Sequence, residues 1–257
     1  ARESFKTDKD GMNGSYLGPE YQGDYVQKEL VRLNAEYKHF VDGEGLLDKV
    51  AQLLAEGKSI AWMNGRMEFG PRALGNRSIL ADPRSEKMQS ELNRKIKFRE
   101  SFRPFAPSVL EEKAGEFFDL ISSSPYMMFV AKVKKSQRLS SSTNQILKGL
   151  DKQKMIQSKI PAVTHVDYSA RIQTVSKEDN ERFYQLIKKF GEITDCPMLV
   201  NTSFNVRGEP IVCTPEDAYA CFMNTNLDYL VIGDFFLEKQ LQQSSEIGKY
   251  RKKYTFD

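Results

Sequence analysis

The chain has 257 residues, 40% hydrophobic and 28% charged, a composition typical of a folded protein and unlike that of a disordered one. Its 38 Lys and Arg exceed its 35 Asp and Glu by only three, which excludes a surface coated with basic charge, so we expect any basic site to be local. No apolar run approaches the roughly 18 residues of a membrane span, and the first residues do not resemble a signal peptide.

Three cysteines and two histidines are too few for a disulfide framework or a histidine-rich metal site. We therefore expect a reducing, cytoplasmic location and no metal ion held by protein ligands. Residues 1–42 are polar, carry a Gly18-Pro19 turn signal and a short helix near 28–36, and are interpreted as a linker or wrap-around arm. We expect the folded domain over 43–237 and a polar tail over 238–257.

The domain opens with a predicted amphipathic helix over 44–56, where five apolar residues share one face and Gly57 follows at the position of a C-terminal cap. Residues 59–63 predict a buried strand that runs directly into a loop rich in Gly, Arg and Pro. A second strand is expected near 79–81, followed by a short basic helix over 85–96.

Strands and helices continue to alternate through the remaining chain. Thr214 and Pro215 predict a helix start, with Thr as N-cap and Pro in the first helical position, which makes Cys221 a core residue. A shift to Lys, Ser and Gln over 134–158 predicts a surface excursion. The other expected elements are strands over 127–133, 170–175, 198–200 and 229–232 and a helix over 180–190.

The loop after the first buried strand reads GRMEFGPRALGNRS over residues 65–78. Its glycines let backbone amides approach an anion, and arginine supplies paired donors for phosphate or carboxylate oxygens. The simpler alternative is a tight turn whose arginines pair with acids such as Glu68 and Asp82. The pattern is neither a Walker loop nor GxGxxG.

A basic stretch follows between Arg84 and Arg103, where seven basic and three acidic residues give a local charge of +4, above the +3 of the whole chain. Phenylalanines alternate with these cations, a pattern that suits single-stranded nucleic acid, because bases stack on the rings while cations follow the phosphates. A compact polyphosphate would use the same cations, and Pro104 and Pro107 favour a fixed loop over an open groove. The simpler alternative is that this basic stretch is a solvent-exposed helix end with no binding role.

A third stretch, NTSFNVRGEP over residues 201–210, follows a predicted strand. Small hydroxyl and amide side chains beside a glycine can bind a sugar or a phosphate, although a plain turn has the same composition.

Together these stretches resemble the C-terminal domain of the NodU-type O-carbamoyltransferases, the nodulation and antibiotic-tailoring family. The resemblance runs from Tyr16-Leu17-Gly18-Pro19 to Leu237 and implies an α/β (α+β) fold, a YrdC-like twisted mixed sheet flanked by helices. The YrdC similarity lies in Thr202-Ser203-x-Asn205 with Gly208-Glu209-Pro210, and in Lys97-x-Arg99 followed by Arg103. The segments that carry the family resemblance are residues 65–84, 99–107, 165–175 and 201–217.

The resemblance implies a reaction in two steps. This half would take carbamoyl phosphate and ATP with Mg²⁺, release phosphate to give carbamate, and let carbamate attack the α-phosphorus to form carbamoyl adenylate and pyrophosphate. An N-terminal actin-like half, which this chain lacks, would hold iron and pass the carbamoyl group to an acceptor hydroxyl. We therefore expect the chain to be a fragment, a transferase that is incomplete without its N-terminal domain, with no nucleic acid or membrane as partner.

The expected site consists of side chains that position two polyanions rather than attack them covalently. The cations that the resemblance assigns to carbamoyl phosphate and the phosphate chain are Arg72, Lys97, Arg103 and Arg171. The residues expected to bind the nucleotide or the carbamoyl group are Arg66, Glu68, Arg99, Asn201, Ser203, Asn205 and Arg207. The single His165 beside this segment is interpreted as structural.

Two other functions stay open. A YrdC-like accessory domain that binds a nucleotide or RNA without chemistry is suggested by the local charge of +4, and salt-sensitive RNA binding would favour it. A threonylcarbamoyl-AMP synthase that uses bicarbonate and threonine would share the YrdC similarity, but the GRMEFGPRALG loop argues against it.

Overall fold

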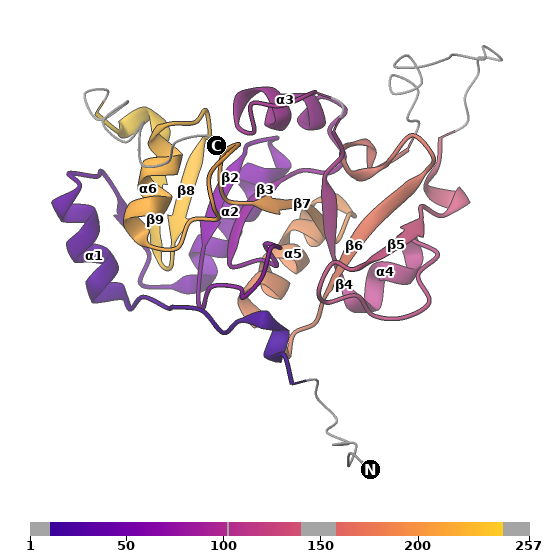
Figure 1. The fold of residues 1–257 in the computed structure, drawn as a ribbon, viewed down its shortest axis with the longest axis horizontal. Helices are drawn as coiled ribbons and strands as arrows, with labels where there is room; N and C mark the ends of the chain where they lie inside the picture. The colour runs from indigo at the N-terminus through magenta and orange to yellow at the C-terminus, as the bar shows by residue number, and fades with distance from the viewer. Residues whose placement is uncertain (1–10, 102, 140–157, 244–257) are drawn as a thin grey trace.

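The computed structural model describes residues 11–101, 103–139 and 158–243. Within these ranges a nine-stranded sheet runs in the order β1-β9-β8-β2-β3-β7-β4-β6-β5. Figure 1 shows β8 and β9 toward one end of the sheet and β5 and β6 toward the other. The strands are β1 (Lys38–His39), β2 (Ile60–Met63), β3 (Arg77–Ala81), β4 (Ala106–Leu110), β5 (Phe129–Lys132), β6 (Ser169–Val175), β7 (Met198–Ser203), β8 (Tyr229–Ile232) and β9 (Phe235–Glu238).

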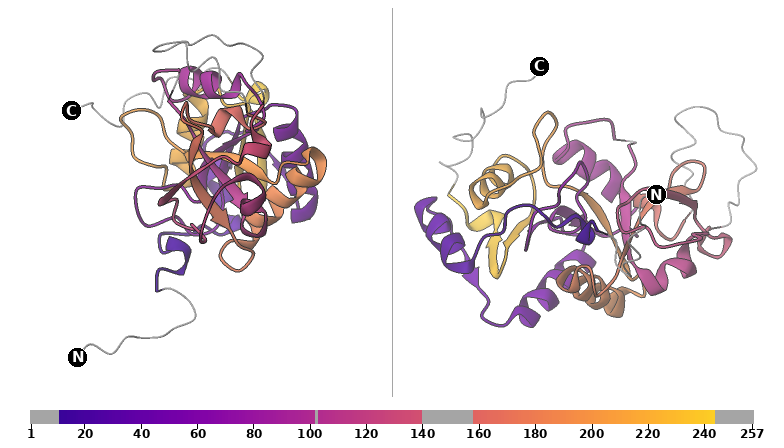
Figure 2. Two further views of the ribbon diagram at one scale, coloured as in Figure 1. Left: turned by 90° about the vertical axis from the view of Figure 1, so that its right-hand side faces the viewer. Right: turned by 60° about the horizontal axis from the view of Figure 1, so that its bottom comes forward.

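The sheet is mixed, because β2 pairs with β8 and β4 with β6 in parallel while the other pairs are antiparallel. Helices cover it: α2 and α5 pack against each other, as Figure 2 shows, α5 lies on β4 and β7, and α6 lies on β2 and β8. The predicted fold class, a twisted mixed sheet flanked by helices, is confirmed. The helices are α1 (Gly23–Arg32), α2 (Gly43–Ala55), α3 (Met88–Lys95), α4 (Glu111–Phe117), α5 (Glu181–Thr194) and α6 (Pro215–Met223).

Capping residues mark the helix ends that the sequence predicts. The carboxylate of Asp42 accepts a hydrogen bond from the backbone N of Glu44 at 2.9 Å, and α2 ends near Gly57, whose φ of +80° suits glycine. Thr214 caps α6 through a reciprocal capping box. Cys221 on α6 is 4% exposed, which confirms it as a core residue.

The segment after Pro104 differs from the predicted fixed loop. It contains β4, in which Pro107 lies opposite Val200 of β7, and α4 follows directly. Proline has no N–H to donate to a strand ladder, so its presence argued against a strand here. The pairing of β4 on both sides, with β6 and β7, supports the strand despite that missing donor.

The N-terminal arm packs on the domain in the structure. Its helix lies over α1 rather than 28–36 and contacts α6, and β1 pairs with β9. The domain boundaries at 43 and 237 stay predictions, and most of the predicted excursion and tail lies outside the described residues. No helix in the described ranges is both long enough and apolar enough to cross a membrane.

Candidate functional site

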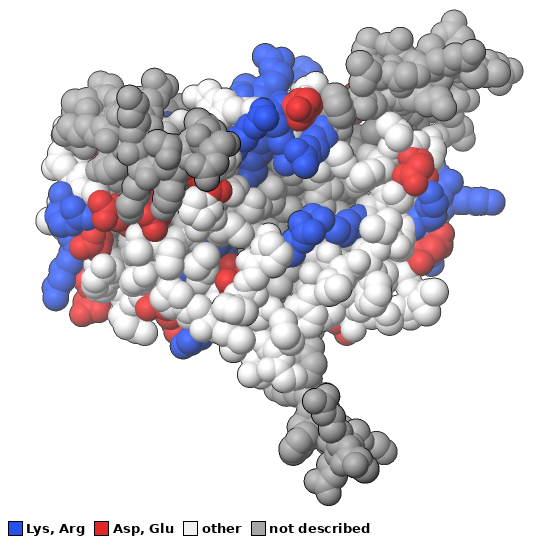
Figure 3. Space-filling view, viewed as in Figure 1, with Lys and Arg blue, Asp and Glu red and all other residues white. Residues whose placement is uncertain are grey.

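Four chain segments meet at an open cleft of about 430 Å³, to which each contributes side chains. They are the loop after β2, the segment leading into β4, the turn before β6 together with β6 itself, and the end of β7, and Met127 and Val130 at β5 complete the lining. We call this the arginine cleft, after the four arginines that line it, Arg72, Arg99, Arg103 and Arg171. Figure 3 shows Lys and Arg side chains gathered on two sides of a hollow on this face.

A smaller cavity of about 250 Å³ adjoins the arginine cleft. The two share Arg99, Arg103 and Ser203, and the smaller cavity adds Lys97, Asn205 and Arg207 among its lining residues. The fold therefore brings nine of the eleven predicted site residues to one continuous depression. The nine that line it are Arg72, Lys97, Arg99, Arg103, Arg171, Asn201, Ser203, Asn205 and Arg207.

Three arginines of the cleft have no counter-charge among the described residues. Among the described residues, no hydrogen bond or ion pair involves the side chains of Arg72, Arg103 or Arg171, and Nε of Arg171 is buried without a partner. Burial and then the neighbouring Arg72 lower the pKa of Arg171. Guanidinium groups that repel one another without a carboxylate between them form a strong anion site.

Arg99 is held in place by helix α3. Its Nε donates to Oδ1 of the buried Asn93 at 2.6 Å, and its guanidinium lies 4.9 Å from the ring centre of Phe105. Burial and then Arg103 lower the pKa of Arg99 to about 10. Phe105 is only 4% exposed, so this ring supports an arginine and is not free to stack on a base.

Lys97 is buried between the end of α3 and the loop after β7. Its Nζ donates to the backbone O of Ser203, to Oδ1 of Asn205 at 2.8 Å and to the backbone O of Asn205 at 2.9 Å. Burial lowers the pKa of Lys97 to about 7. In the structure this lysine therefore holds the loop after β7, whereas the resemblance assigns it to substrate binding.

A buried polar network underlies the cleft. Nδ2 of Asn201 donates to the backbone O of Ala73 at 3.1 Å, to Oγ of Ser108 at 2.9 Å and to Oε1 of Gln173 at 3.0 Å. Nε2 of Gln173 in turn donates to the backbone O of Leu74 at 2.7 Å. The network fixes the loop that carries Arg72 to strands β4, β6 and β7.

Glu68 and Arg66 do not line the cleft but shape it. Oε1 of the buried Glu68 accepts hydrogen bonds from the backbone N of Leu74 at 2.7 Å and of Asn76 at 2.8 Å, and so folds the loop back on itself. Arg66 donates to the backbone O of Tyr16 at 3.2 Å and ties the arm to this loop. The alternative in which loop arginines pair with Asp82 is not found, because Asp82 pairs with Arg84 at 2.7 Å.

His165 is a cleft residue that we did not predict as functional. It lies in the turn before β6 and lines the arginine cleft. The local sequence does not predict this position, because it depends on how distant segments pack together. The proximity of the predicted cation Arg171, six positions away on β6, was the one signal available in the sequence.

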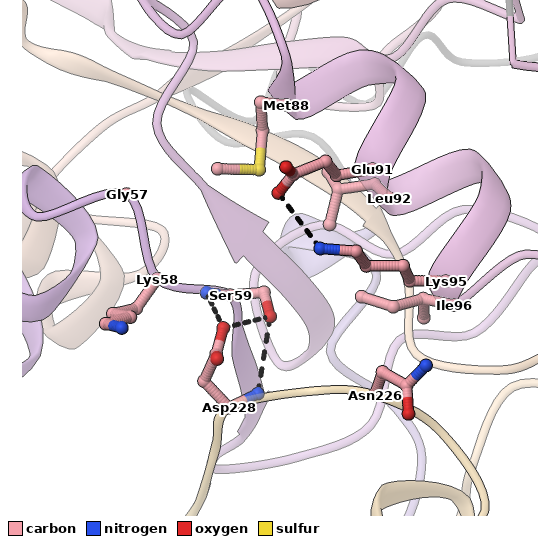
Figure 4. A pocket seen from close by; sticks show the side chains of 10 residues that line it. All are labelled: Gly57, Lys58, Ser59, Met88, Glu91, Leu92, Lys95, Ile96, Asn226 and Asp228. Atoms are coloured by element: carbon pink, nitrogen blue, oxygen red, sulfur yellow. Dashed lines mark hydrogen bonds and ion pairs between the residues drawn. The ribbon is translucent and has the colours of Figure 1, made fainter.

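A second pocket, of about 210 Å³, lies between α3 and the starts of β2 and β8 (Figure 4). There Asp228 accepts hydrogen bonds from N and Oγ of Ser59 at 2.8 and 2.7 Å, and Glu91 pairs with Lys95 at 3.5 Å. Its acids are engaged by protein partners, so it offers much less unpaired charge than the arginine cleft.

The described residues contain no group of three His, Cys, Asp or Glu that could hold a metal ion. A Mg²⁺ ion usually needs only one or two protein carboxylates when phosphates supply the other oxygens. Among the described residues that line the arginine cleft there is no Asp or Glu, so phosphate oxygens would have to supply the anionic ligands of Mg²⁺ there.

Fold and cleft together define an α/β domain with a cleft lined by four arginines. The chain belongs to the carbamoyltransferase C-terminal family, whose model, described as Carbamoyltransferase C-terminus, matches residues 51–239. This confirms the family resemblance drawn from the loops.

Relatives of the chain include bacterial nodulation proteins. The chain is 54% identical over 252 residues to an uncharacterized protein of Synechocystis, covering 96% of this chain and 41% of that one. It is 38% identical over 175 residues to nodulation protein U of Sinorhizobium fredii, covering 68% of this chain and 27% of that one. The chain thus spans about a quarter to two fifths of these relatives.

Among solved structures, full-length HypF in its phosphate- and nucleotide-bound form aligns over 79% of this chain and 22% of that one. The TM-score is 0.44 at 16% sequence identity, a similarity that indicates nothing about function.

Proposed function

We propose that this domain forms carbamoyl adenylate from carbamoyl phosphate and ATP. The observation that carries the proposal is the arginine cleft, in which Arg72, Arg103 and Arg171 have no counter-charge among the described residues. Membership of the carbamoyltransferase family supplies the carbamoyl chemistry.

Electrostatics explain why such a reaction needs several unpaired cations. Two unit charges 4 Å apart repel by about 4 kcal/mol at an effective dielectric constant of 20, and both substrates carry several negative charges. Arg72 and Arg171 would hold the phosphate of carbamoyl phosphate, while Arg99 and Arg103, which line both cavities, would hold the nucleotide phosphates. Each substrate would then approach the other with its charge neutralised.

The chemistry divides into two balanced steps. Water adds to the carbonyl carbon of carbamoyl phosphate, and the bond from carbon to the phosphate oxygen breaks. One proton of the water goes to the departing phosphate and the other to solvent, and carbamate stays in the cleft. A carbamate oxygen then attacks the α-phosphorus of ATP, and the bond to the β-phosphate oxygen breaks to release pyrophosphate. Mg²⁺, when bound to ATP, would offset the charge of its phosphates.

The remaining site residues would orient the substrates. Ser203 and Asn205, in the loop clamped by Lys97, would contact the nucleotide phosphates or the carbamoyl group, with Arg207 beside them. Asn201 contributes the cleft floor. Transfer to an acceptor hydroxyl would belong to the part of the longer relatives that this chain does not span.

The test is pyrophosphate release by the purified chain with Mg·ATP, with and without carbamoyl phosphate. We expect release only when both substrates are present. ATP binding without release would contradict adenylation and favour the accessory domain that binds a nucleotide or RNA. Release that depends on threonine and bicarbonate would instead identify a threonylcarbamoyl-AMP synthase.

A further inference from the structure

His165 brings a titratable imidazole into the arginine cleft. The side chain is half-buried and lines the same cleft as Arg72 and Arg171. No hydrogen bond between described residues involves its imidazole. A histidine that serves only the fold usually has its ring nitrogens satisfied by protein groups, so this environment does not support the structural interpretation made from sequence.

The turn that carries His165 is held rigidly. The backbone N of His165 donates to the O of Ser169 at 2.9 Å, and the N of Tyr168 donates back to the O of His165 at 2.9 Å. Tyr168 has a φ of 61°, a left-handed conformation that costs a bulky residue free energy. Oδ1 of Asp167 accepts from Oγ of Ser169 at 2.6 Å, and Oδ2 accepts from Nζ of Lys132 on β5 at 2.9 Å. A strained turn with this many supports is typical of a residue held for function.

Burial favours a neutral imidazole at His165. Burial lowers the pKa of His165, Asp167 in the same turn opposes that shift, and Arg171 on β6 reinforces it. The other charged groups that line the cleft among the described residues, Arg72, Arg99 and Arg103, are all cations. The imidazole is therefore ready to accept a proton at neutral pH.

The two chemical steps differ in their need for a base. Carbamate is already an anion when it attacks the α-phosphorus, so that step removes no proton. The preceding step adds neutral water to a carbonyl carbon, and one of the water protons must leave as the C–O bond forms. A proton acceptor in the cleft is useful for the first step alone.

We propose that His165 accepts a proton from the water that attacks carbamoyl phosphate, an inference that rests on the proposed function. The water oxygen bonds to the carbonyl carbon while His165 takes one proton. The tetrahedral intermediate then collapses, the bond from carbon to the phosphate oxygen breaks, and His165 returns the proton to the departing phosphate. Carbamic acid remains and loses its own proton to solvent as carbamate.

The test separates this step by supplying carbamate directly. An ammonium bicarbonate solution contains carbamate at equilibrium, so pyrophosphate release can be measured from Mg·ATP with either carbamoyl phosphate or this solution. We expect His165→Gln to slow release from carbamoyl phosphate by at least about 100-fold, since general base catalysis typically contributes 10² to 10⁴. Release from supplied carbamate should stay within about twofold of the unsubstituted chain.

The matched control is His39→Gln, which makes the same change at the other histidine of the chain, in exposed β1, and should leave both rates unchanged. Equal loss with both substrates in His165→Gln, or no loss with either, would overturn the role of His165. If the unsubstituted chain releases pyrophosphate with neither substrate, the proposed function itself is wrong. If it uses only supplied carbamate, adenylation stands and the carbamate-releasing role of His165 is overturned.

Discussion

The ammonium group of Lys97 lies 2.8 Å from Oδ1 and 2.9 Å from the backbone O of Asn205, although more than a hundred residues separate the two. A lysine on the helical side of the cleft thereby holds the loop after β7 on the other side. This contact fixes one side of the smaller cavity. The loop after β7, which would bind the nucleotide, therefore depends on the buried Lys97.

Removal of this cation should destabilise the domain. Lys97→Ala leaves the half-buried oxygens of Ser203 and Asn205 without this donor, and loss of a charged hydrogen bond costs about 1.5 to 3 kcal/mol. Urea unfolding measures the change. Lys95→Ala removes only the exposed pair with Glu91 at 3.5 Å and should cost under about 1 kcal/mol, so equal losses in both variants would contradict the clamp.

The same lysine gives the stability a pH dependence of known sign. Burial lowers the pKa of folded Lys97 to about 7, whereas an unfolded lysine has a pKa of about 10.4. Between these values the unfolded state binds more protons, so this group makes the free energy of unfolding rise as pH increases from about 7 to 10. Urea unfolding at pH 7 and 9.5 should show a smaller rise for Lys97→Met than for the unsubstituted chain, and equal rises would contradict the assignment.

Glu68 should matter for the shape of the arginine loop rather than for charge in the cleft. Glu68→Ala leaves the backbone N–H groups of Leu74 and Asn76 without their acceptor, which should lower the free energy of unfolding by about 2 kcal/mol. The KM for carbamoyl phosphate should rise because Arg72 lies on the same loop. The exposed Glu86→Ala is the control, and an unchanged KM in Glu68→Ala would count against the loop's role.

The loop also depends on Gly75, which has a φ of +114° and approaches Phe183 of α5. A Cβ atom added here would overlap the Phe183 ring, so Gly75→Ala should cost about 1 to 3 kcal/mol more than the backbone strain alone. Gly70→Ala isolates that strain, because Gly70 has a φ of +132° and no atom within 4 Å of an added Cβ. Thermal unfolding of both variants measures the difference, and equal melting temperatures would contradict the close packing.

Much of this arrangement was predictable from local sequence. The apolar face of α2 and the Thr214 cap of α6 are local patterns, and the structure confirms both. The basic loops indicated an anion site, because glycine and arginine are concentrated after strands. The family resemblance selected eleven residues, of which the fold brings nine to the arginine cleft and the smaller cavity beside it.

Other features depend on contacts that no local pattern reports. Strand β4 was not predicted, because proline is disfavoured in strands and Pro107 lies within it. The structure shows that pairing with both β6 and β7 holds this segment as a strand. Lys97 was expected to face a substrate, but its partners lie in the β7 loop, far away in sequence. A functional role for His165 could not be predicted from sequence, because only the folded chain places it in the arginine cleft.

The central claim is that the unpaired arginines of the cleft drive adenylation. Pyrophosphate release from Mg·ATP and carbamoyl phosphate should fall at least about tenfold in Arg72→Ala and in Arg171→Ala, since a charged hydrogen bond contributes about 1.5 to 3 kcal/mol. Arg94→Ala, on the exposed surface of α3 outside the cleft, should keep the rate of the unsubstituted chain. Unchanged release in both cleft variants would contradict the account.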